Sequence, residues 1–387
     1  MKKILLIHTE YTQTGGEDIA VRKETDFLKK HFKVDSLVFQ NTKSLKINDL
    51  VSFFLNRNNK SVIKLKKKIE EFQPDYIYIH NLWFKASLGI LDFVLKDKLE
   101  VFLKVHNFRY DCTKSFLSSV HLKKENICKA CGLQRKRVGF FNKYYEDSFA
   151  KSVLVNNFGK KYFRMLQNKN LKILTLTKHH KDYLIKLGFD SDNIFVQPNP
   201  MPNLSNTINK ETKKKNQIIY AGRISEEKGL EELIDAWQSI DTKDYKLKII
   251  GEGPFYSNIE KLIEKINTID LIKYKENQEV LEIINESKAV VTATKLYEGQ
   301  PTLLCEASIL SVPSIFPDSG GIKDYFPEGY DLKFEQYNYK DLAEKLKKVI
   351  NSTNLKIQGE KNKSYIIDYL NEENLLLSLK STLENRE

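Results

Sequence analysis

The chain has 387 residues, which is long enough for two domains that each bury a full hydrophobic core. Its apolar content of 41% and aromatic content of 11% indicate an ordered globular protein rather than a disordered one. No uninterrupted apolar run reaches the roughly 18 residues that a membrane span needs, and the run Ile4–Ile7 is too short for a secretory signal. We therefore expect a cytoplasmic protein.

Charge is distributed unevenly along the chain. Residues 1–200 carry 37 Lys and Arg against 20 Asp and Glu, a net charge of +17, whereas residues 201–387 carry 26 against 31, a net charge of −5. This asymmetry indicates two domains with different partners. The basic N-terminal part could face anionic lipid at the inner side of a membrane, where each nearby cation contributes roughly 1 kcal/mol. A general lysine bias would explain the same excess.

Strands alternate with helices along nearly the whole chain. In the first half we expect strands at 3–7, 34–39, 76–80, 101–105 and 171–176, and helices at 17–30 and 60–72. The alternation restarts with strands at 217–220, 247–251, 289–293 and 314–316, and helices at 229–240, 256–266, 278–286 and 303–310. Such alternation predicts parallel sheets covered on both faces, so two series predict an α/β protein with two Rossmann-like, doubly wound domains.

The expected domain limits are 1–197, a linker at 198–216, a second domain at 217–365 and a C-terminal segment at 366–387. Prolines at 198, 200 and 202 stiffen the linker, and lysines at 213–215 mark exposed chain. Two doubly wound domains facing each other would form a central cleft at the carboxyl ends of their strands, where ligands usually bind.

Two glutamates, Glu298 and Glu306, are separated by seven residues. The segment before Pro301 predicts a turn, and Thr302 is expected to cap a helix that begins at Leu303. Backbone N–H groups at such a helix start hold an anion well. This arrangement suits a phosphorylated sugar, with phosphate on the helix end and hydroxyls on the two acids. The pair alone is a weak signal, because glutamate is common.

Two cations, Arg223 and Lys228, follow the first strand of the second series and are flanked by Gly222 and Gly229. Fixed at that place, they would neutralise a diphosphate leaving group, Arg as a fork and Lys as a point charge. A pair of solvated surface charges is the alternative interpretation. Further glycine- and proline-containing motifs lie at 250–254, 312–315 and 319–322.

In the first domain, Gly15 and Gly16 lie between the first strand and the first helix, where glycine lets the backbone approach a ligand or simply makes a turn. His80 and His106 each end a predicted strand and each precede an asparagine. A single histidine is more often structural, but two His-Asn pairs at strand ends indicate a site, and His106 is the stronger candidate.

Three cysteines fall close together, in a segment that we read as an insertion at about 107–137. Cys128 and Cys131 have the spacing of zinc ligands, and Cys112 with His121 could complete four ligands. Reduced thiols are the alternative in a cytoplasmic protein. Cys305 is expected in the core.

Two segments have a membrane-docking pattern. The run Phe53–Leu55 precedes several cations, namely Arg57, Lys60, Lys64, Lys66, Lys67 and Lys68. A second cationic cluster lies at 134–137. A solvated helix face and a surface loop would give the same pattern.

The ordered motifs from Ala221 to Ile322 together resemble glycosyltransferase family 4, the retaining nucleotide-sugar transferases of GT-B fold. The likeness covers the second half of the chain and, more loosely, the first. It implies that the last helix, 372–383, returns to the first domain. It also implies contacts of Glu306 with the nucleotide ribose, and of Glu298 and His106 with the donor sugar. The implied catalytic residues are Glu298, His106, Arg223 and Lys228. The implied nucleotide-sugar-binding residues are Glu306, Thr302, Leu303, Gly222, Gly15, Gly16 and Gly299.

The resemblance implies a metal-independent, retaining hexosyltransferase without a cofactor. Its acceptor would be a saccharide or a lipid-linked saccharide, in the synthesis of bacterial capsule, O-antigen or exopolysaccharide. Gln300, Ser311 and Glu276 depart from the family pattern, which leaves sugar and base preference open. The alternatives are a GT-B sugar-nucleotide epimerase or phosphorylase, and a non-catalytic basic binding protein. No nucleic-acid partner is expected.

Overall fold

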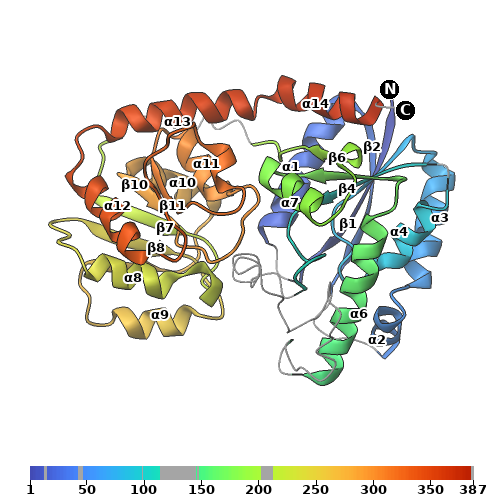
Figure 1. Cartoon of the computed structure of the whole chain (residues 1–387), viewed down its shortest axis with the longest axis horizontal. Helices are drawn as coiled ribbons and strands as arrows, with labels where there is room; N and C mark the ends of the chain where they lie inside the picture. The colour runs from blue at the N-terminus through green and yellow to red at the C-terminus, as the bar shows by residue number, and fades with distance from the viewer. Residues whose placement is uncertain are drawn as a thin grey trace. The chain divides into compact units, whose positions relative to one another are not determined.

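The computed structural model describes residues 1–12, 15–41, 47–97, 99–113, 145, 148–201 and 212–384. The chain divides into two compact units (Figure 1). Unit 1 comprises Met1–Met201 together with Glu372–Glu387, and unit 2 comprises Pro202–Asn371. The division therefore falls within the segment 198–216 that was expected to be a linker, and residues 202–211 of that segment lie outside the described part.

Unit 1 is built on a six-stranded parallel sheet with the order β2-β1-β3-β4-β5-β6. Its strands are β1 (Lys3–Glu10), β2 (Lys33–Gln40), β3 (Tyr76–Ile79), β4 (Glu100–Val105), β5 (Leu171–Thr175) and β6 (Ile194–Val196). The apolar run Ile4–Ile7 and all of β3 are buried, because helices cover both faces of a parallel sheet.

Seven described α-helices surround this sheet. They are α1 (Gly16–His31), α2 (Ile47–Phe54), α3 (Asn59–Phe72), α4 (Leu88–Val94), α6 (Phe149–Leu166), α7 (Lys178–Lys186) and α14 (Glu372–Glu384). Four of these helices begin at a capping side chain, which explains where they start. The caps are Asn58 for α3, Ser87 for α4, Ser148 for α6 and Thr177 for α7.

The C-terminal helix α14 belongs to unit 1 (Figure 1). Leu375, Leu379 and Leu383 are buried against residues of β1, α1 and β3. Glu372, at the start of the helix, pairs with Lys30 of α1 at 2.8 Å. Unit 1 is therefore made from two segments that lie far apart in the sequence.

Unit 2 has a second six-stranded parallel sheet with the order β12-β11-β10-β7-β8-β9. Its strands are β7 (Gln217–Ala221), β8 (Lys246–Ile250), β9 (Ile269–Ile272), β10 (Ala289–Val291), β11 (Ser314–Pro317) and β12 (Lys333–Phe334). Its α-helices are α8 (Leu230–Gln238), α9 (Tyr256–Ile263), α10 (Asn277–Glu286), α11 (Thr302–Ile309), α12 (Tyr339–Asn351) and α13 (Leu355–Tyr369). Three-residue and four-residue 3-10 turns lie at Glu226–Lys228 and Ile322–Tyr325, and another in unit 1 at Ser191–Asn193.

The order of strands places a topological switch point in each sheet. In unit 2 the chain runs outward from β7 to β9, crosses over and continues with β10 on the other side of β7, which is the Rossmann order. In unit 1 the corresponding reversal lies between β1 and β3. Ligands of doubly wound sheets bind beyond the carboxyl ends of the strands at such points.

The start of α11 differs from its expected form. The prediction that Thr302 caps this helix is wrong, because Thr302 is its first residue and Pro301 occupies the cap position without a side-chain hydrogen bond. The carbonyl of Pro301 accepts hydrogen bonds from the N–H groups of Leu304 and Cys305, so the helical pattern begins one residue earlier. Cys305 is buried in the core as expected.

Candidate functional site

Lys228 and Glu298 meet at the switch point of unit 2. Lys228 ends the 3-10 turn after β7, and its Nζ lies 2.6 Å from Oε1 of Glu298, in the loop after β10. Thr294 Oγ1 donates a second hydrogen bond to the same oxygen at 3.0 Å. Burial raises the pKa of Glu298, but the charge and hydrogen bond of Lys228 and the bond from Thr294 outweigh it and hold that pKa below its usual value. Glu298 is therefore an ionised carboxylate at neutral pH.

Glycines allow the loops of unit 2 to pack closely around this pair. Gly229 has a positive φ of 69°, and a Cβ there would lie 2.2 Å from the carbonyl oxygen of Ala293. A Cβ at Gly251, where φ is 147°, would lie 1.9 Å from the carbonyl oxygen of Gly222. No side chain fits at either place, so the loops after β7, β8 and β10 contact one another through glycine.

Arg223 lies in the same loop as Lys228 but is exposed. The Tyr220 hydroxyl donates a hydrogen bond to the Arg223 carbonyl at 2.9 Å, which fixes the backbone there. Its guanidinium forms no ion pair with another residue of the described ranges. The loop after β7 therefore offers one cation already paired with a carboxylate and a second one open to an anion.

Glu306 is buried on the first turns of α11, with 4% of its surface exposed. Asn277 Nδ2, at the start of α10, donates to Glu306 Oε1 at 3.4 Å. Thr302 and Leu303 occupy the first turn of the helix, where backbone N–H groups lack helical partners. The segment from Glu298 to Glu306 thus joins two carboxylates to the amino end of a helix.

The motif at 319–322 supports the Glu298 loop. Gly320, with φ of 60°, packs against the backbone of Tyr297 and Glu298, and the Gly321 N–H donates to the Glu298 carbonyl at 3.0 Å. Gln300, in the same loop, accepts a hydrogen bond from the Tyr325 hydroxyl at 3.3 Å. Gln300 therefore has a polar partner where relatives of the resembled family often carry an apolar residue.

Ser311 and Glu276, the two other residues that depart from the family pattern, lie at a turn and before a helix. Ser311 adopts a positive φ of 56°, the left-handed region that glycine occupies without strain. Glu276 is the residue before α10, and its N–H donates to Oε2 of Glu279 at 3.3 Å.

In unit 1 the structure brings His80 and His106 together. They follow the neighbouring strands β3 and β4, and His80 Nδ1 lies 2.9 Å from His106 Nε2. Burial lowers the pKa of both imidazoles, and nearby Lys104 lowers both further. Both rings are therefore neutral at pH 7. They line a cavity of about 30 Å³ that also includes Trp83 and Arg109.

The glycine pair of unit 1 lies at the amino end of α1. Gly15 is the residue before the helix and Gly16 is its first residue. The Gly15 N–H donates to Asp18 Oδ2 at 2.9 Å, and Asp18 Oδ1 lies 2.9 Å from His8 Nε2. This buried His8–Asp18 pair anchors the loop after β1.

Three of the four predicted zinc ligands lie outside the described residues, so the structure does not test the zinc site. His121, Cys128 and Cys131 lie outside them, as does most of the expected insertion at 107–137, and Cys112 is buried. Within the described ranges no group of three or more His, Cys, Asp or Glu is placed to hold a metal ion. The zinc site stays a prediction.

The membrane-docking segment is only partly as expected. Phe53 is not an exposed wedge: it is buried and stacks on Phe158 with ring centroids 5.6 Å apart. Phe54 and Leu55 are exposed, as is Ile63 on α3. The cluster at 134–137 lies outside the described residues. None of the described helices combines the length and the apolar character that crossing a membrane requires.

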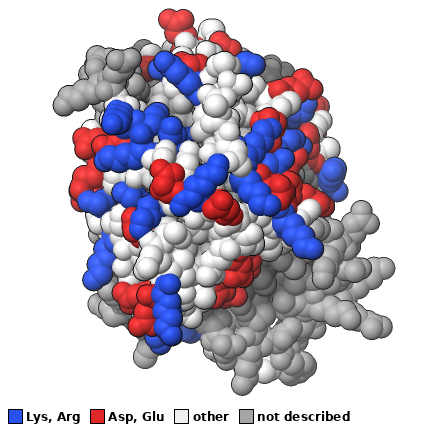
Figure 2. All heavy atoms as spheres, turned by 90° about the vertical axis from the view of Figure 1, so that its left-hand side faces the viewer, with Lys and Arg blue, Asp and Glu red and all other residues white. Residues whose placement is uncertain are grey.

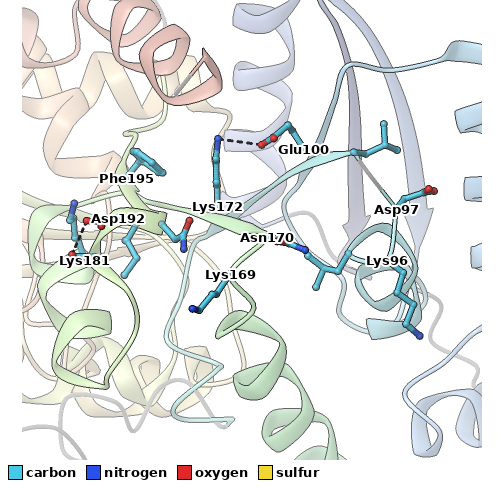
Figure 3. Close-up of a pocket in the computed structure, with 14 residues that line it drawn as sticks. Lys96, Asp97, Glu100, Lys169, Asn170, Lys172, Lys181, Asp192 and Phe195 are labelled. Atoms are coloured by element: carbon cyan, nitrogen blue, oxygen red, sulfur yellow. Dashed lines mark hydrogen bonds and ion pairs between the residues drawn. The ribbon is translucent and has the colours of Figure 1, made fainter. Parts of the chain in front are cut away.

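A hollow of about 1040 Å³ lies at the amino ends of the strands of unit 1, opposite to the carboxyl ends that His80 and His106 follow (Figure 3). It is lined from the amino ends of β4, β5 and β6, and an ion pair of 3.2 Å between Lys172 and Glu100 crosses it. Because ligands of parallel sheets bind at the carboxyl ends, we do not assign the site to this hollow.

Charge on unit 2 is mixed. On the face shown in Figure 2, Lys and Arg lie between Asp and Glu rather than in separate patches. On α12, for example, Lys347 pairs with Glu344 at 2.7 Å and Lys345 with Asp341 at 3.6 Å. The net basic charge belongs to the first half of the sequence.

Sequence reasoning missed the buried charges behind the histidines. Lys104, within β4, and Glu24, on α1, form an ion pair of 2.7 Å in the core of unit 1. The signal that could have found this pair is a lysine inside an otherwise apolar strand, since a buried cation requires a nearby acid.

Residues 205–366 match the family model described as "Glycosyl transferases group 1". The amylovoran biosynthesis glycosyltransferase AmsD of Erwinia amylovora is 28% identical over 202 residues, which cover 46% of this chain and 54% of that protein. The capsular polysaccharide biosynthesis glycosyltransferase CapM of Staphylococcus aureus is 30% identical over 196 residues, covering 48% of this chain and 50% of that protein. The chain thus spans about half the length of the curated relatives it matches.

Solved structures resemble the whole chain. The lipopolysaccharide outer core galactosyltransferase WaaB has a TM-score of 0.65 at 17% identity, covering 98% of this chain and 99% of that one. Anabaena HepE in complex with UDP-glucose has a TM-score of 0.66 at 12% identity, covering both chains fully at 100%. At such identities the likeness establishes the fold, which is GT-B with two Rossmann-like domains. The family match lies within residues 205–366, and the two curated relatives are named for the biosynthesis of amylovoran and of capsular polysaccharide.

Proposed function

We propose that the chain is a retaining glycosyltransferase of family 4, which moves a sugar from a nucleotide-diphosphate donor to a saccharide acceptor in the synthesis of a bacterial surface polysaccharide. The observation that carries the proposal is the arrangement at the switch point of unit 2. There, an open cation, Arg223, lies in the same loop as Lys228, which is paired at 2.6 Å with the carboxylate of Glu298.

Arg223 and Lys228 would bind the donor diphosphate together with the first-turn amides of α11 at Thr302 and Leu303. Lys228 would contact both the diphosphate and Glu298. The carboxylate of Glu298 would accept hydrogen bonds from the sugar hydroxyls. Glu306 would accept hydrogen bonds from the ribose. Fixed positive charge at the leaving group is the largest aid to such a reaction, because it stabilises the charge that develops as the bond breaks.

Retention would follow from attack on the same face as the leaving group. The bond between the anomeric carbon and the phosphate oxygen breaks, the acceptor oxygen bonds to that carbon, and the acceptor proton passes to the departing phosphate. No carboxylate nucleophile is needed, and Glu298 is engaged by Lys228 and Thr294. We propose no cofactor and no divalent ion, since Arg223 and Lys228 supply the charge that a metal would otherwise provide.

The acceptor class is inferred from the names of the relatives. AmsD and CapM are named for amylovoran and capsular polysaccharide biosynthesis, and a Staphylococcus aureus relative, 27% identical over 224 residues, is a poly(ribitol-phosphate) alpha-N-acetylglucosaminyltransferase. We propose a saccharide acceptor, attached to a lipid carrier, and a transferred hexose.

A panel of nucleotide sugars, tested without acceptor or metal, checks this proposal. Thermal shift and slow donor hydrolysis are measured on the wild type, on Arg223→Ala, on Glu306→Ala and on the control Lys347→Ala, whose lysine pairs with Glu344 on α12. We expect one donor to stabilise the wild type and the control but neither site variant. Conversion of the donor into another sugar nucleotide would favour an epimerase, and no response to any donor would contradict the proposal.

We also propose that unit 1 docks on anionic membrane lipid through α2 and α3. Phe54, Leu55 and Ile63 are exposed apolar side chains, and Lys60, Lys64 and Lys67 of α3 are exposed cations. Apolar side chains beside cations match the interface of an anionic bilayer.

Sedimentation with vesicles tests the docking surface. We expect the wild type to bind vesicles that contain phosphatidylglycerol but not neutral ones. The double variant Phe54→Ser/Leu55→Ser should lose binding, while Ile357→Ser, which removes an equally exposed apolar side chain from α13 of unit 2, should keep it. Equal binding by both variants would contradict this surface.

A further inference from the structure

A buried carboxylate lies behind the two histidines of unit 1. Glu24 is 1% exposed, and its Oε1 accepts hydrogen bonds from Lys104 Nζ and from the Tyr78 hydroxyl, both at 2.7 Å. Its other oxygen, Oε2, lies 3.8 Å from His80 Nε2. In the described part of the chain neither of these two atoms has a hydrogen-bond partner. In the described part of the chain, Glu24 Oε2 and His80 Nε2 are therefore the nearest candidates for a hydrogen bond with each other.

The position of Glu24 determines where His80 carries its proton. A neutral imidazole holds one proton, on Nδ1 or on Nε2. A lone pair on Nε2 facing a buried carboxylate would repel it and leave both atoms without a hydrogen bond, whereas a proton on Nε2 is attracted to it. A small approach of the two groups then closes the 3.8 Å gap to a hydrogen bond, as such contacts often do when ligand binds.

The proton on His80 determines the proton on His106 in turn. With its proton on Nε2, His80 has a lone pair at Nδ1, which lies 2.9 Å from His106 Nε2. His106 must then donate from Nε2 and leave its own Nδ1 unprotonated. Since burial keeps His106 neutral, the only nitrogen of this ring that remains for a ligand is a hydrogen-bond acceptor.

We propose that Glu24 is a positioning residue that fixes the tautomer of His106 through His80, so that His106 presents an unprotonated Nδ1 to the ligand. The group that contacts it must then be a donor, such as a sugar hydroxyl. Lys104 and Tyr78 hold the carboxylate in place by occupying its other oxygen. The assignment of a sugar hydroxyl rests on the proposed function, while the tautomer does not.

Nitrogen-15 NMR of the histidine rings tests the tautomer directly in the full-length wild type. Long-range correlations report which ring nitrogen carries the proton, and the variants His80→Asn and His106→Gln assign the two spin systems by loss of signal. We expect protonated Nε2 in both rings. A proton on Nδ1 of His106 would overturn the proposal, whatever the enzymatic activity of the chain.

The variant Glu24→Gln tests the cause. Its amide oxygen would face Lys104 and Tyr78, which places the amide NH₂ against His80 Nε2, so that both histidines change tautomer. Tyr78→Phe is the matched control, because it removes a hydrogen bond from the same carboxylate but leaves Oε2 facing His80. If Glu24→Gln does not fold, Glu24→Gln with Lys104→Met removes the unpaired buried cation. An unchanged His106 tautomer in a folded Glu24→Gln chain would overturn the proposal.

Donor hydrolysis gives a second test of Glu24. It separates failure of the proposed function from failure of the positioning role. With an active donor, we expect Glu24→Gln to lower kcat about tenfold with little change in KM, and Tyr78→Phe to change kcat less than about twofold. Equal losses in both variants would overturn the positioning role. If no donor reacts with the wild type, the proposed function fails, and the NMR result still decides the tautomer.

Discussion

The two units hold their site charges in opposite ways. In unit 2, Lys228 and Glu298 pair at 2.6 Å with 24% and 27% of their side chains exposed, and Arg223 is exposed nearby. In unit 1, Lys104 and Glu24 pair at a similar 2.7 Å with 0% and 1% exposed. A partly exposed pair, which water reaches, can open to a ligand at less cost, while a fully buried pair is fixed and can only orient its neighbours. The same residue types thus suit binding in one unit and positioning in the other.

Removing the cation from each pair tests this contrast most strongly. Lys104→Met should destabilise unit 1 by about 3–5 kcal/mol, because it leaves a buried carboxylate without its charge partner. Lys228→Met should cost about 1 kcal/mol or less, because water reaches the remaining carboxylate. Urea unfolding of both variants measures the difference. Similar losses would show that exposure does not separate the two pairs.

The glycines of the two sites provide a second contrast. Gly251→Ala should destabilise unit 2 by roughly 2–3 kcal/mol, since the new Cβ would meet the Gly222 carbonyl at 1.9 Å and φ is 147°. Gly15→Ala in unit 1 is the control, because no atom lies within 4 Å of its Cβ position. We expect a loss below about 1 kcal/mol there. Thermal unfolding compares the stability of the two variants. A Gly251→Ala variant as stable as the wild type would contradict the close packing of these loops.

Ser311 gives a smaller effect of opposite sign. Its φ of 56° strains a residue with a Cβ, so Ser311→Gly should stabilise unit 2 by about 1 kcal/mol. Ser308→Gly, within the neighbouring helix α11, should instead destabilise it, since glycine weakens a helix interior. Denaturant midpoints measure both changes, and a loss of stability in Ser311→Gly would contradict the strain.

The smallest effect concerns pH. Lys228 and Thr294 hold the pKa of Glu298 below its usual value of 4.5, so the folded state binds this proton less readily than the unfolded chain. The stabilisation is therefore present above about pH 4.5 and is lost as the pH falls through the folded pKa. For a partly exposed pair we expect less than about 1 kcal/mol. Urea unfolding between roughly pH 3 and pH 6 should show a steeper pH dependence for the wild type than for Glu298→Gln.

Local sequence patterns were sufficient for most strands of the two sheets. Apolar runs such as Ile4–Ile7 became the buried strands of the sheets, because a parallel sheet is covered on both faces. Some elements were not predicted. The strands β6, with three residues, and β12, with two, are too short for a periodic pattern, and the longer helices α6, α12 and α13 were also missed. The cap of α11 was misplaced by one residue because Thr302 is a favourable cap, although Pro301 occupies that position.

The two sites differ in how much the sequence could tell. In unit 2 the candidate residues lie within short motifs, so a family resemblance could point to Arg223, Lys228 and Glu298. In unit 1 the contacts join Glu24 to partners 54 to 80 residues away. A single sequence contains no signal for such pairings, and only the fold brings Glu24 to His80.

The return of α14 to unit 1 has a consequence for biosynthesis. Leu375, Leu379 and Leu383 fill the core beside β1, yet they are translated after every residue of unit 2. On the ribosome, the domain that begins first therefore completes its core last, and unit 2 can finish folding while the sheet of unit 1 still exposes an apolar groove. A chain stalled before residue 372 would present that groove to chaperones and proteases.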